Sequence, residues 1–222
     1  MLTCGNVGKT YATERGPVVA VRGVDLEVPR GEFVAVVGRS GSGKSSLMAM
    51  IGGLSRPSAG TVLIEDTDIW SLADDDLTDF RSRRIGFVFQ FASLLPTLRI
   101  IDNVALPSLL GRHADADAAY GRAADLLARL GLAEQLDAHP SELSSGQQRR
   151  AAIARALINA PSLLLADEPT SDLDEETEAE IMAEFRDLVR DARMTFIMVT
   201  HNLRLAEEAD RVFHIADGAL VP

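Results

Sequence analysis

Short apolar runs alternate with polar, helix-like segments along most of the chain. The runs at 33–37, 85–89, 162–166 and 195–199 are apolar at nearly every position, and 211–215 is expected to close the chain as the last strand. Continuous runs of this length are typical of strands that are buried on both faces of a sheet. Strands that alternate with helices in this way predict an α/β fold with a largely parallel sheet.

Other short patterns predict β structure near the N-terminus. Residues 18–21 and 24–28 are rich in valine and predict two short strands, and 61–64 predicts another. The acidic, irregular segment 74–80 predicts a solvated helix or a loop.

The composition changes between about 102 and 138, where alanine, leucine and arginine recur with helical spacing. Residues 118–130 form the clearest amphipathic helix, and Gly131 is expected to end it. A further helix is expected from 149 to 158, and another from 175 to 190. The pattern therefore predicts a helical lobe inserted between strands.

A glycine-rich turn joins the strand at 33–37 to a helix-like segment that starts near Ser46. The glycines let backbone N–H groups turn inward, and the helix N-terminus adds to an anion site. Lys44 is expected to place its ammonium near the outer phosphates of a nucleotide, and the Ser45 hydroxyl can reach a Mg²⁺ ion. The residues expected to bind the nucleotide here are Gly38, Arg39, Ser40, Gly41, Ser42, Gly43, Lys44, Ser45 and Ser46.

Polar side chains follow three further apolar runs, at the point where each run ends. Because ligands gather at the carboxyl ends of strands in such a sheet, these side chains are expected to meet the phosphate-binding turn. Asp167 is placed to hold Mg²⁺, and Glu168 can act as a base or position the attacking water. Gln90 offers an amide oxygen to the metal or to that water. His201 can donate a hydrogen bond to the γ-phosphate and orient the water.

Composition narrows the class of protein. A length of 222 residues suits one domain, and 46% hydrophobic residues are ordinary for a soluble globular protein. The formal net charge of -11 argues against a nucleic-acid partner. No apolar run approaches the roughly 18–20 residues that span a bilayer, and the N-terminus lacks a secretion pattern, so we expect a cytosolic protein. The single cysteine, Cys4, is expected in a buried strand rather than at a lipid-attachment site.

Taken together, these motifs resemble those of the ABC-transporter ATPase subunits over essentially the full chain. Residues 38–45 look like the Walker A motif of that family, and 163–168 look like its Walker B motif with the catalytic glutamate. Gln90 matches the Q-loop glutamine, and His201 matches the switch histidine.

Three further matches make the resemblance specific. Residues 143–147 match the LSGGQ signature, which separates this family from other phosphate-loop ATPases. Residues 171–174 match the D-loop, and Tyr11 falls where the family stacks an aromatic ring on adenine.

The resemblance implies a phosphate-loop NTPase (RecA-like) core with a mostly parallel sheet, an N-terminal antiparallel β part and an inserted helical subdomain. Within a single domain of residues 1–222, the core lobe is expected at 1–92 and 156–222. The helical lobe that carries the signature is expected at 93–155.

The resemblance also implies ATP and Mg²⁺ as ligands and a homodimer that closes head to tail around two ATP molecules. Ser144 and the N–H of Gly146 are then expected to face the γ-phosphate of the partner's nucleotide, and Gln147 of the signature is expected to bind the nucleotide with them. Two departures from the family pattern affect this expectation. Ser145 replaces the first glycine of the signature, and Asp172 places a carboxylate in the D-loop.

The stretches 89–98 and 102–107 are similar to those of the lipoprotein-releasing and macrolide-exporting branch. In the family, the loop after the Q-loop glutamine binds a coupling helix of the membrane subunit. That role would use Phe91, Leu94 and Leu95; the alternative is that these side chains pack against the chain's own helical lobe.

We therefore expect an ATPase motor subunit on the cytoplasmic face of the inner membrane that drives a separate integral-membrane permease. Export or extraction of a lipoprotein, lipid, peptide or drug is the expected task. The alternatives are an importer ATPase or a member that signals across the membrane in cell division. Soluble relatives that serve DNA repair or translation fit less well, since this chain has a short helical insertion and one cassette.

Overall fold

The computed structural model describes residues 1–14, 16–111, 114–171, 173–191 and 193–221. The larger sheet in these ranges has the strand order β10-β9-β3-β8-β7-β6. All of its neighbouring strands pair in parallel except β9 and β10. The expected largely parallel sheet is thus confirmed. Its strands are β3 (Phe33–Val37), β6 (Ile85–Val88), β7 (Leu163–Asp167), β8 (Thr195–Thr200), β9 (Arg211–Ala216) and β10 (Ala219–Val221).

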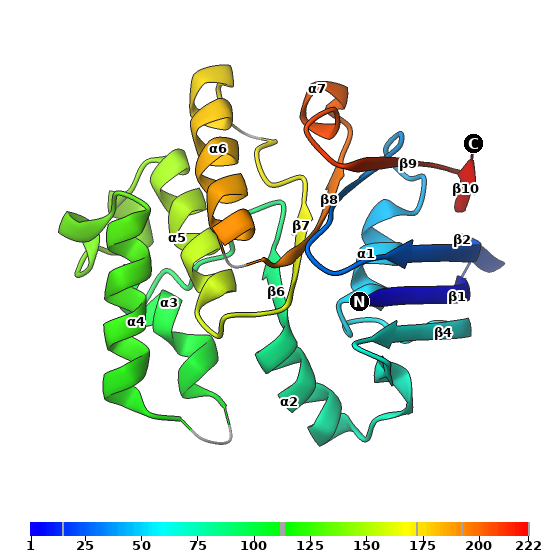
Figure 1. Ribbon diagram of the computed structural model, residues 1–222, viewed down its shortest axis with the longest axis horizontal. Coiled ribbons are helices and arrows are strands. Elements are labelled where there is room, and N and C mark those ends of the chain that lie inside the picture. Colours follow the sequence, from blue (N-terminus) through cyan, green and yellow to red (C-terminus); the bar gives the residue numbers. More distant parts are fainter. Residues whose placement is uncertain (15, 112–113, 172, 192, 222) are drawn as a thin grey trace.

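Both faces of the larger sheet are covered, because alternate residues of each central strand enter different cores. In β7, Leu163 and Leu165 pack on the side of helix α1 (Lys44–Ile51) and the smaller sheet. Leu164 and Ala166 pack on the side of the other helices. Figure 1 shows β6, β7 and β8 standing between these two layers.

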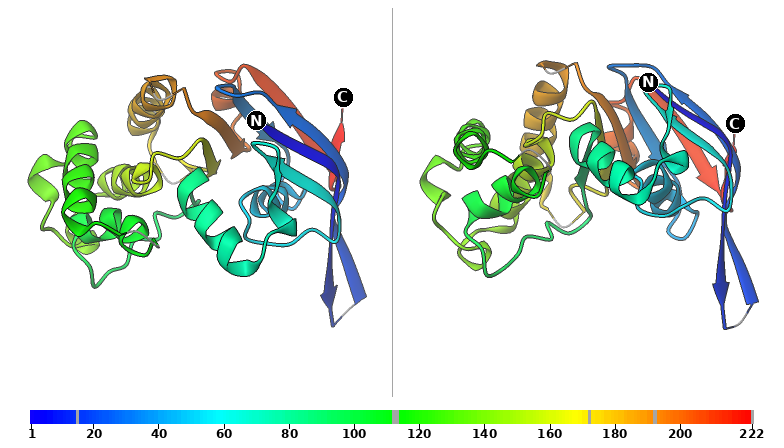
Figure 2. Two further views of the ribbon diagram at one scale, coloured as in Figure 1. Left: turned by 60° about the horizontal axis from the view of Figure 1, so that its bottom comes forward. Right: turned by 90° about the horizontal axis from the view of Figure 1, so that it is seen from below.

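The smaller sheet is antiparallel, with the order β2-β1-β4-β5 in the described residues. It comprises β1 (Leu2–Thr13), β2 (Gly16–Val28), β4 (Ala59–Ile64) and β5 (Thr67–Asp68). The hairpin of β1 and β2, drawn in blue, extends away from the body in both views of Figure 2.

The structure corrects one sequence prediction about the smaller sheet and confirms another. The prediction of separate strands at 18–21 and 24–28 is wrong, because β2 runs through both; Gly23, at a φ of 59°, takes up the register shift between them. The expectation for Cys4 is confirmed: it is buried in β1, and burial raises the pKa of its thiol to about 12.

The prediction that 211–215 is the last strand is also wrong, because β10 follows it. Asp217 and Gly218 both have positive φ and connect β9 to β10 as a tight hairpin. Asp-Gly is a strong signal for such a turn, because glycine adopts positive φ without a steric penalty and aspartate tolerates it.

The segment 74–80 belongs to a helix, α2 (Asp74–Arg84), which was one of its two expected states. Its first turn holds three aspartates and its last turn three arginines. This distribution places negative charge at the positive end of the helix dipole and positive charge at the other end.

The remaining helices cover one side of the larger sheet (Figure 1). They are α3 (Ile100–Leu109), α4 (Ala116–Arg129), α5 (Ser145–Leu157) and α6 (Glu175–Asp191), with the one-turn α7 (Leu203–Ala206) near the end and 3₁₀ turns at Ala133–Gln135 and Pro140–Glu142. A further 3₁₀ turn, Ile69–Ser71, lies on the other side, where Ile69 packs with α1 and the smaller sheet. The end of α4 at Gly131, where φ is 70°, agrees with the sequence expectation. Helix α5 begins four residues before the predicted start, and it runs across the predicted lobe boundary at 155–156. None of the helices in the described ranges combines the length and apolar character needed to cross a bilayer.

Two glycine substitutions test the packing of these layers. Gly121→Ala, at an exposed position of α4 with no heavy atom within 4 Å of the added Cβ, should stabilise the fold by about 0.5–1 kcal/mol. Gly86→Ala should destabilise it by about 1–3 kcal/mol, because the Cβ would lie 2.5 Å from the Ala156 carbonyl oxygen of α5. Urea denaturation of both variants measures the free energies. Equal stability of the two would contradict the close approach of β6 to α5.

Candidate active site

An open cavity of about 490 Å³ lies where the phosphate-binding turn meets the carboxyl ends of the parallel strands. It brings together side chains that are far apart in the sequence, as expected from the strand ends. Its lining residues are Ala20, Ser40, Gly41, Gly43, Lys44, Ser45, Ser46, Gln90, Glu168 and His201.

The turn between β3 and α1 approaches neighbouring backbone too closely for larger residues. A Cβ at Gly43 would lie 2.3 Å from the Ala20 carbonyl oxygen, and one at Gly38 would lie 2.4 Å from the Ile215 carbonyl oxygen. Gly43 also has a φ of 105°, just before the first helical residue. The turn is therefore held close to the neighbouring backbone just before α1, and a helix N-terminus is a place where backbone N–H groups can bind an anion.

The polar side chains of the turn fit a phosphate group. Lys44 is 7% exposed, and its ammonium donates to the carbonyl oxygens of Gly38 at 2.7 Å and Arg39 at 3.1 Å. An ammonium has three hydrogens to donate, so it can also bind a phosphate oxygen. Ser42 Oγ is the buried side-chain polar atom that lacks a partner within the described residues. A polyanion in the turn would supply an acceptor for this hydroxyl.

Oxygen donors that could hold a metal lie beside the turn. Asp167 ends β7, and burial raises the pKa of its carboxyl, opposed by a hydrogen bond from Ser45. The described residues contain no group of three or more His, Cys, Asp or Glu arranged to hold a metal ion. One carboxylate and one hydroxyl, with Gln90 nearby, nevertheless suit Mg²⁺, which completes its shell with phosphate oxygens and waters.

Glu168 and His201 contact each other at the edge of the cavity. Nδ1 of His201 lies 2.8 Å from Oε2 of Glu168, and the Thr200 hydroxyl donates to the same oxygen at 3.3 Å. Glu168 has a φ of 47°, a left-handed conformation that is uncommon outside glycine. Its N–H donates to the Val199 carbonyl oxygen, so the chain turns sharply while it is still anchored to β8. The side chain of Glu168 is 13% exposed and that of His201 is 67% exposed.

A residue that the sequence reasoning missed supports these two turns. Glu178 of α6 accepts hydrogen bonds from the Thr170 hydroxyl at 2.8 Å and from the Asn202 amide at 3.2 Å. Thr170 lies two residues after Glu168, and Asn202 directly follows His201. The Glu178 carboxylate therefore connects the segments after β7 and β8 to α6. The sequence around Glu178, which lies three residues after the first residue of α6, gives no indication of this contact.

Tyr11 lies beside the cavity rather than in its lining. Its hydroxyl is 3.5 Å from Ser46 Oγ, and this hydrogen bond lowers the pKa of the phenol. The ring is 38% exposed and Lys9 lies over it, with 5.0 Å between the ammonium and the ring centroid.

The signature residues lie at the start of α5, and none of them is among the described residues that line the cavity. Ser144 is the N-cap: its hydroxyl accepts from the Gln147 N–H, while Gln147 Oε1 accepts from the Ser144 N–H. Gly146 is buried, and a Cβ there would lie 2.9 Å from Thr177 of α6. Ser145 is exposed, so its side chain finds room at the position where the family has glycine. Asp172, the other departure, lies outside the described residues.

The family comparison covers both the glycine-rich turn and the start of the signature helix. A family model described as ABC transporter matches residues 21–171. The chain belongs to the ABC transporter family. It is an ATP-binding subunit of this family and an ATPase.

Similar proteins cover nearly the whole chain. The lipoprotein-releasing system ATP-binding protein LolD of Maricaulis maris is 48% identical over 216 residues, which are 97% of this chain and 94% of that protein. LolD of Syntrophotalea carbinolica is 45% identical over 220 residues, or 99% and 96% of the two chains. The macrolide export ATP-binding/permease protein MacB of Syntrophobacter fumaroxidans is 44% identical over 98% of this chain, which corresponds to 30% of that longer protein.

Solved structures of ABC cassettes share the fold. The dimeric structure of MJ0796, a bacterial ABC transporter cassette, has a TM-score of 0.93 and 37% identity, and covers 100% of this chain and 97% of that one. A dimeric post-hydrolysis state of MJ0796 bound to ADP and Pi has a TM-score of 0.92 and 38% identity, with the same coverage. The α/β phosphate-loop NTPase fold expected from the sequence is therefore confirmed.

Replacing Asp167 separates its effect on the fold from its effect on ligand binding. The pKa of the Asp167 carboxyl is higher in the folded chain than in the unfolded chain, so the folded chain holds this proton more tightly. Once the pH rises above the ordinary pKa, the ionised carboxylate therefore destabilises the fold. Asp167→Asn should therefore raise the Tm of the ligand-free ABC ATPase at pH 7 by about 2 °C. It should also reduce the further rise caused by Mg²⁺-ATP.

Thermal unfolding with and without Mg²⁺-ATP measures both effects. Asp125→Asn, at an exposed position of α4, is the control and should leave the Mg²⁺-ATP effect unchanged. A lower Tm for ligand-free Asp167→Asn would show that the carboxylate stabilises the fold.

Proposed function

We propose that this ABC ATPase is the motor subunit of a transporter: it dimerises head to tail around two Mg²⁺-ATP and drives a separate membrane permease. One observation carries the proposal. The chain has both a phosphate cavity and a signature helix, yet the signature residues lie apart from the cavity. A second copy can bring its own signature to that cavity, and the solved cassettes of MJ0796 are dimeric.

In this mechanism the phosphate-binding turn and Lys44 hold the triphosphate. Ser45, Asp167 and Gln90 would hold the Mg²⁺, which neutralises phosphate charge when it is bound. Ser40, Gly41 and Ser46 line the same cavity and contribute polar contacts. Tyr11 supplies a ring near the start of α1 for the adenine.

Glu168 is the proposed base. It is mostly buried, and it accepts hydrogen bonds from the Thr200 hydroxyl and the His201 backbone N–H. These contacts hold the carboxylate at the cavity edge, where it can accept a proton from the attacking water. His201, close to Glu168 and largely exposed, can reach the γ-phosphate and orient that water. Gln90 follows β6, the strand next to β7, and lines the same cavity.

The cap of α5 leaves the signature serine able to bind a phosphate. A hydroxyl has one donor hydrogen and two acceptor lone pairs, and the Ser144 hydroxyl uses an acceptor position for the Gln147 N–H. Its hydrogen can therefore be donated to a γ-phosphate oxygen of the partner's nucleotide. The N–H of Gly146 and the positive end of the α5 dipole add to the attraction.

A groove beside the Q-loop supports a membrane partner. It is an open cavity of about 390 Å³, lined by residues that include Ile85, Phe87, Phe89, Pro107, Leu110, Ala156 and Ile158. Next to it, Phe91 is 66% exposed and Leu95 is 45% exposed, whereas Leu94 packs against the core. The packing alternative therefore holds for Leu94, and the docking role remains proposed for the other two.

We infer the branch from the relatives. Several are named lipoprotein-releasing system ATP-binding proteins, and one is a macrolide export protein that joins ATP-binding and permease functions. The permease of this chain would be a separate integral-membrane protein that acts on a lipoprotein or a related amphipathic substrate. The ATPase would then sit peripherally on the cytoplasmic face of the inner membrane. The net charge of -11 favours a protein partner over a nucleic acid.

Glu168→Gln tests the catalytic assignment. The amide keeps the shape of the side chain but cannot accept the proton, so kcat should fall at least about 100-fold while ATP binding persists. A closed dimer should then accumulate in gel filtration with Mg²⁺-ATP. Glu175→Gln, an exposed position at the start of α6, is the control and should remain monomeric and active. Parental turnover by Glu168→Gln would exclude Glu168 as the base.

Phe91→Asp tests the docking surface. A charge on this exposed ring position should abolish recovery of the membrane partner from detergent extracts, with basal ATPase activity of the isolated chain kept within about twofold. Val221→Asp, at an exposed position of β10, is the matched control. Equal recovery of the partner by both variants would contradict docking at Phe91.

A further inference from the structure

The loop that joins β6 to α3 has few backbone hydrogen bonds of its own. Between residues 89 and 99, the backbone–backbone bond within the described loop joins the Leu98 N–H to the Leu95 carbonyl oxygen. This loop nevertheless carries Gln90, which lines the nucleotide cavity, and the exposed Phe91. Its conformation must therefore be fixed by other parts of the chain.

Two arginines of α5 fix the first half of the loop. The guanidinium of Arg149 donates to the carbonyl oxygen of Phe89 at 2.6 Å and to that of Gln90. The guanidinium of Arg155 donates to the carbonyl oxygens of Ala92 at 2.8 Å and Ser93 at 2.7 Å. Each arginine thus spans two successive carbonyl groups with its planar fork.

The spacing of the two arginines suits the loop. They are six residues apart, which is about 9 Å along a helix. The two pairs of carbonyls are three residues apart, which is at most about 11 Å of chain. Loop and helix run in the same direction, so both forks can bind at once.

Both guanidinium groups are at least partly removed from water, so they depend on hydrogen bonds to the loop. Arg149 is 4% exposed, and burial lowers the pKa of Arg155. A buried guanidinium is stable only when its N–H groups have partners, because it has lost its hydration. The loop carbonyls supply such partners in the position that the structure shows. Displacing the loop would remove these acceptors from the buried guanidinium of Arg149 and from the half-buried guanidinium of Arg155.

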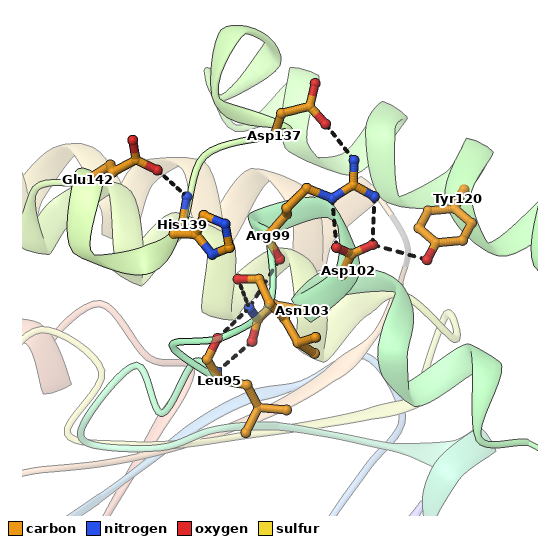
Figure 3. Close-up of polar contacts among 9 residues, drawn as sticks. Leu95, Arg99, Asp102, Asn103, Tyr120, Asp137, His139 and Glu142 are labelled. Atoms are coloured by element: carbon orange, nitrogen blue, oxygen red, sulfur yellow. Dashed lines mark hydrogen bonds and ion pairs between the residues drawn. The ribbon is translucent and has the colours of Figure 1, made fainter.

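Asn103 of α3 fixes the second half of the loop (Figure 3). It is 1% exposed, and its amide oxygen accepts from the Leu95 N–H at 2.6 Å. Its amide nitrogen donates to the carbonyl oxygens of Leu95, Leu98 and Arg99 at 3.0–3.2 Å. Side chains of the helical lobe therefore hold both ends of the loop, with Phe91 between the two arginine forks.

We propose that Arg149 is a positioning residue for Gln90: it fastens the backbone at 89–90 to the signature helix and so sets the Gln90 amide in the nucleotide cavity. Arg155 assists by holding residues 92–93. This inference rests on the role proposed above for Gln90 at the metal or the attacking water. Because Ser144 is the N-cap of the same helix α5, a displacement of Phe91 by a docked partner is transmitted to Gln90 and to the signature through one helix.

A double-mutant cycle tests the proposal, with steady-state Mg²⁺-ATP hydrolysis by the full chain as the assay. Arg149→Lys keeps the charge but loses the two-carbonyl fork. Alone, it should lower kcat about tenfold and change KM for ATP less than about threefold, since it displaces a group that acts in the reaction rather than in nucleotide binding. In the Gln90→Ala background, the same substitution should lower kcat by less than about twofold.

Matched variants keep the test decisive. Arg150→Lys changes the neighbouring arginine of α5, which pairs with Glu180 and Glu184 instead of the loop, and should leave kcat within about twofold. If Arg149→Lys does not fold, Arg155→Lys is tested in the same cycle, with an expected loss of about threefold that again disappears without Gln90. An equal fold-loss in both backgrounds would overturn the positioning role. A parental rate for Gln90→Ala alone would instead refute the role proposed for Gln90.

Discussion

The parallel register of β6, β7, β8 and β3 is the constraint on which the active site depends. In this register Val88 pairs with Ala166, Asp167 with Val199, and Val37 with Thr200. The chain therefore leaves the sheet at the same edge after each strand, and the phosphate turn, Gln90, Glu168 and His201 start from that edge. A slip of one residue in β7 would exchange its two buried faces and carry Glu168 away from His201. Burial on both faces of the sheet fixes the register, and the register fixes the site.

Beyond this edge the chain no longer has the hydrogen bonds between neighbouring strands that pair its backbone groups. Side chains form hydrogen bonds with these segments instead. Thr200 and Asn202 bond to each other and to the carboxylates of Glu168 and Glu178. Arg149 does the equivalent for the carbonyl groups beyond β6. Buried polar groups of this kind are stable only in complete networks, so the strand ends are held in one arrangement. A rigid arrangement before ligand binding reduces the reorganisation needed for reaction.

The sequence predicted the elements whose signal is local. Continuous apolar runs predict the central strands, and the rule for strand ends brings Gln90, Glu168 and His201 to the phosphate-binding turn. The hairpin to β10 was missed although Asp217-Gly218 signals it. The start of α5 was placed late because its first residues are polar, while the cap that begins it depends on the pairing of Ser144 with Gln147. Arg149 could not be assigned, because an arginine in an alanine-rich helix has the pattern of a solvated face until the loop beside it is known.

Electrostatics explain why nucleotide binding and pairing of two copies should be linked. The chain carries a formal net charge of -11, Glu168 lines the cavity with Lys44, and the Asp167 carboxyl lies close enough to Lys44 to interact with it electrostatically. A triphosphate adds further negative charge to a partly desolvated site, where repulsion is stronger than in water. Lys44, the start of α1 and a divalent cation offset part of this charge. In the proposed head-to-tail dimer, the N-terminus of the partner's α5 would bring a further positive dipole and the Ser144 hydroxyl. It would add no carboxylate from its first turn, which contains no acidic residue. Loss of the γ-phosphate would then remove the charge that this helix end attracts, so in the proposed mechanism hydrolysis itself weakens the contact between the two copies.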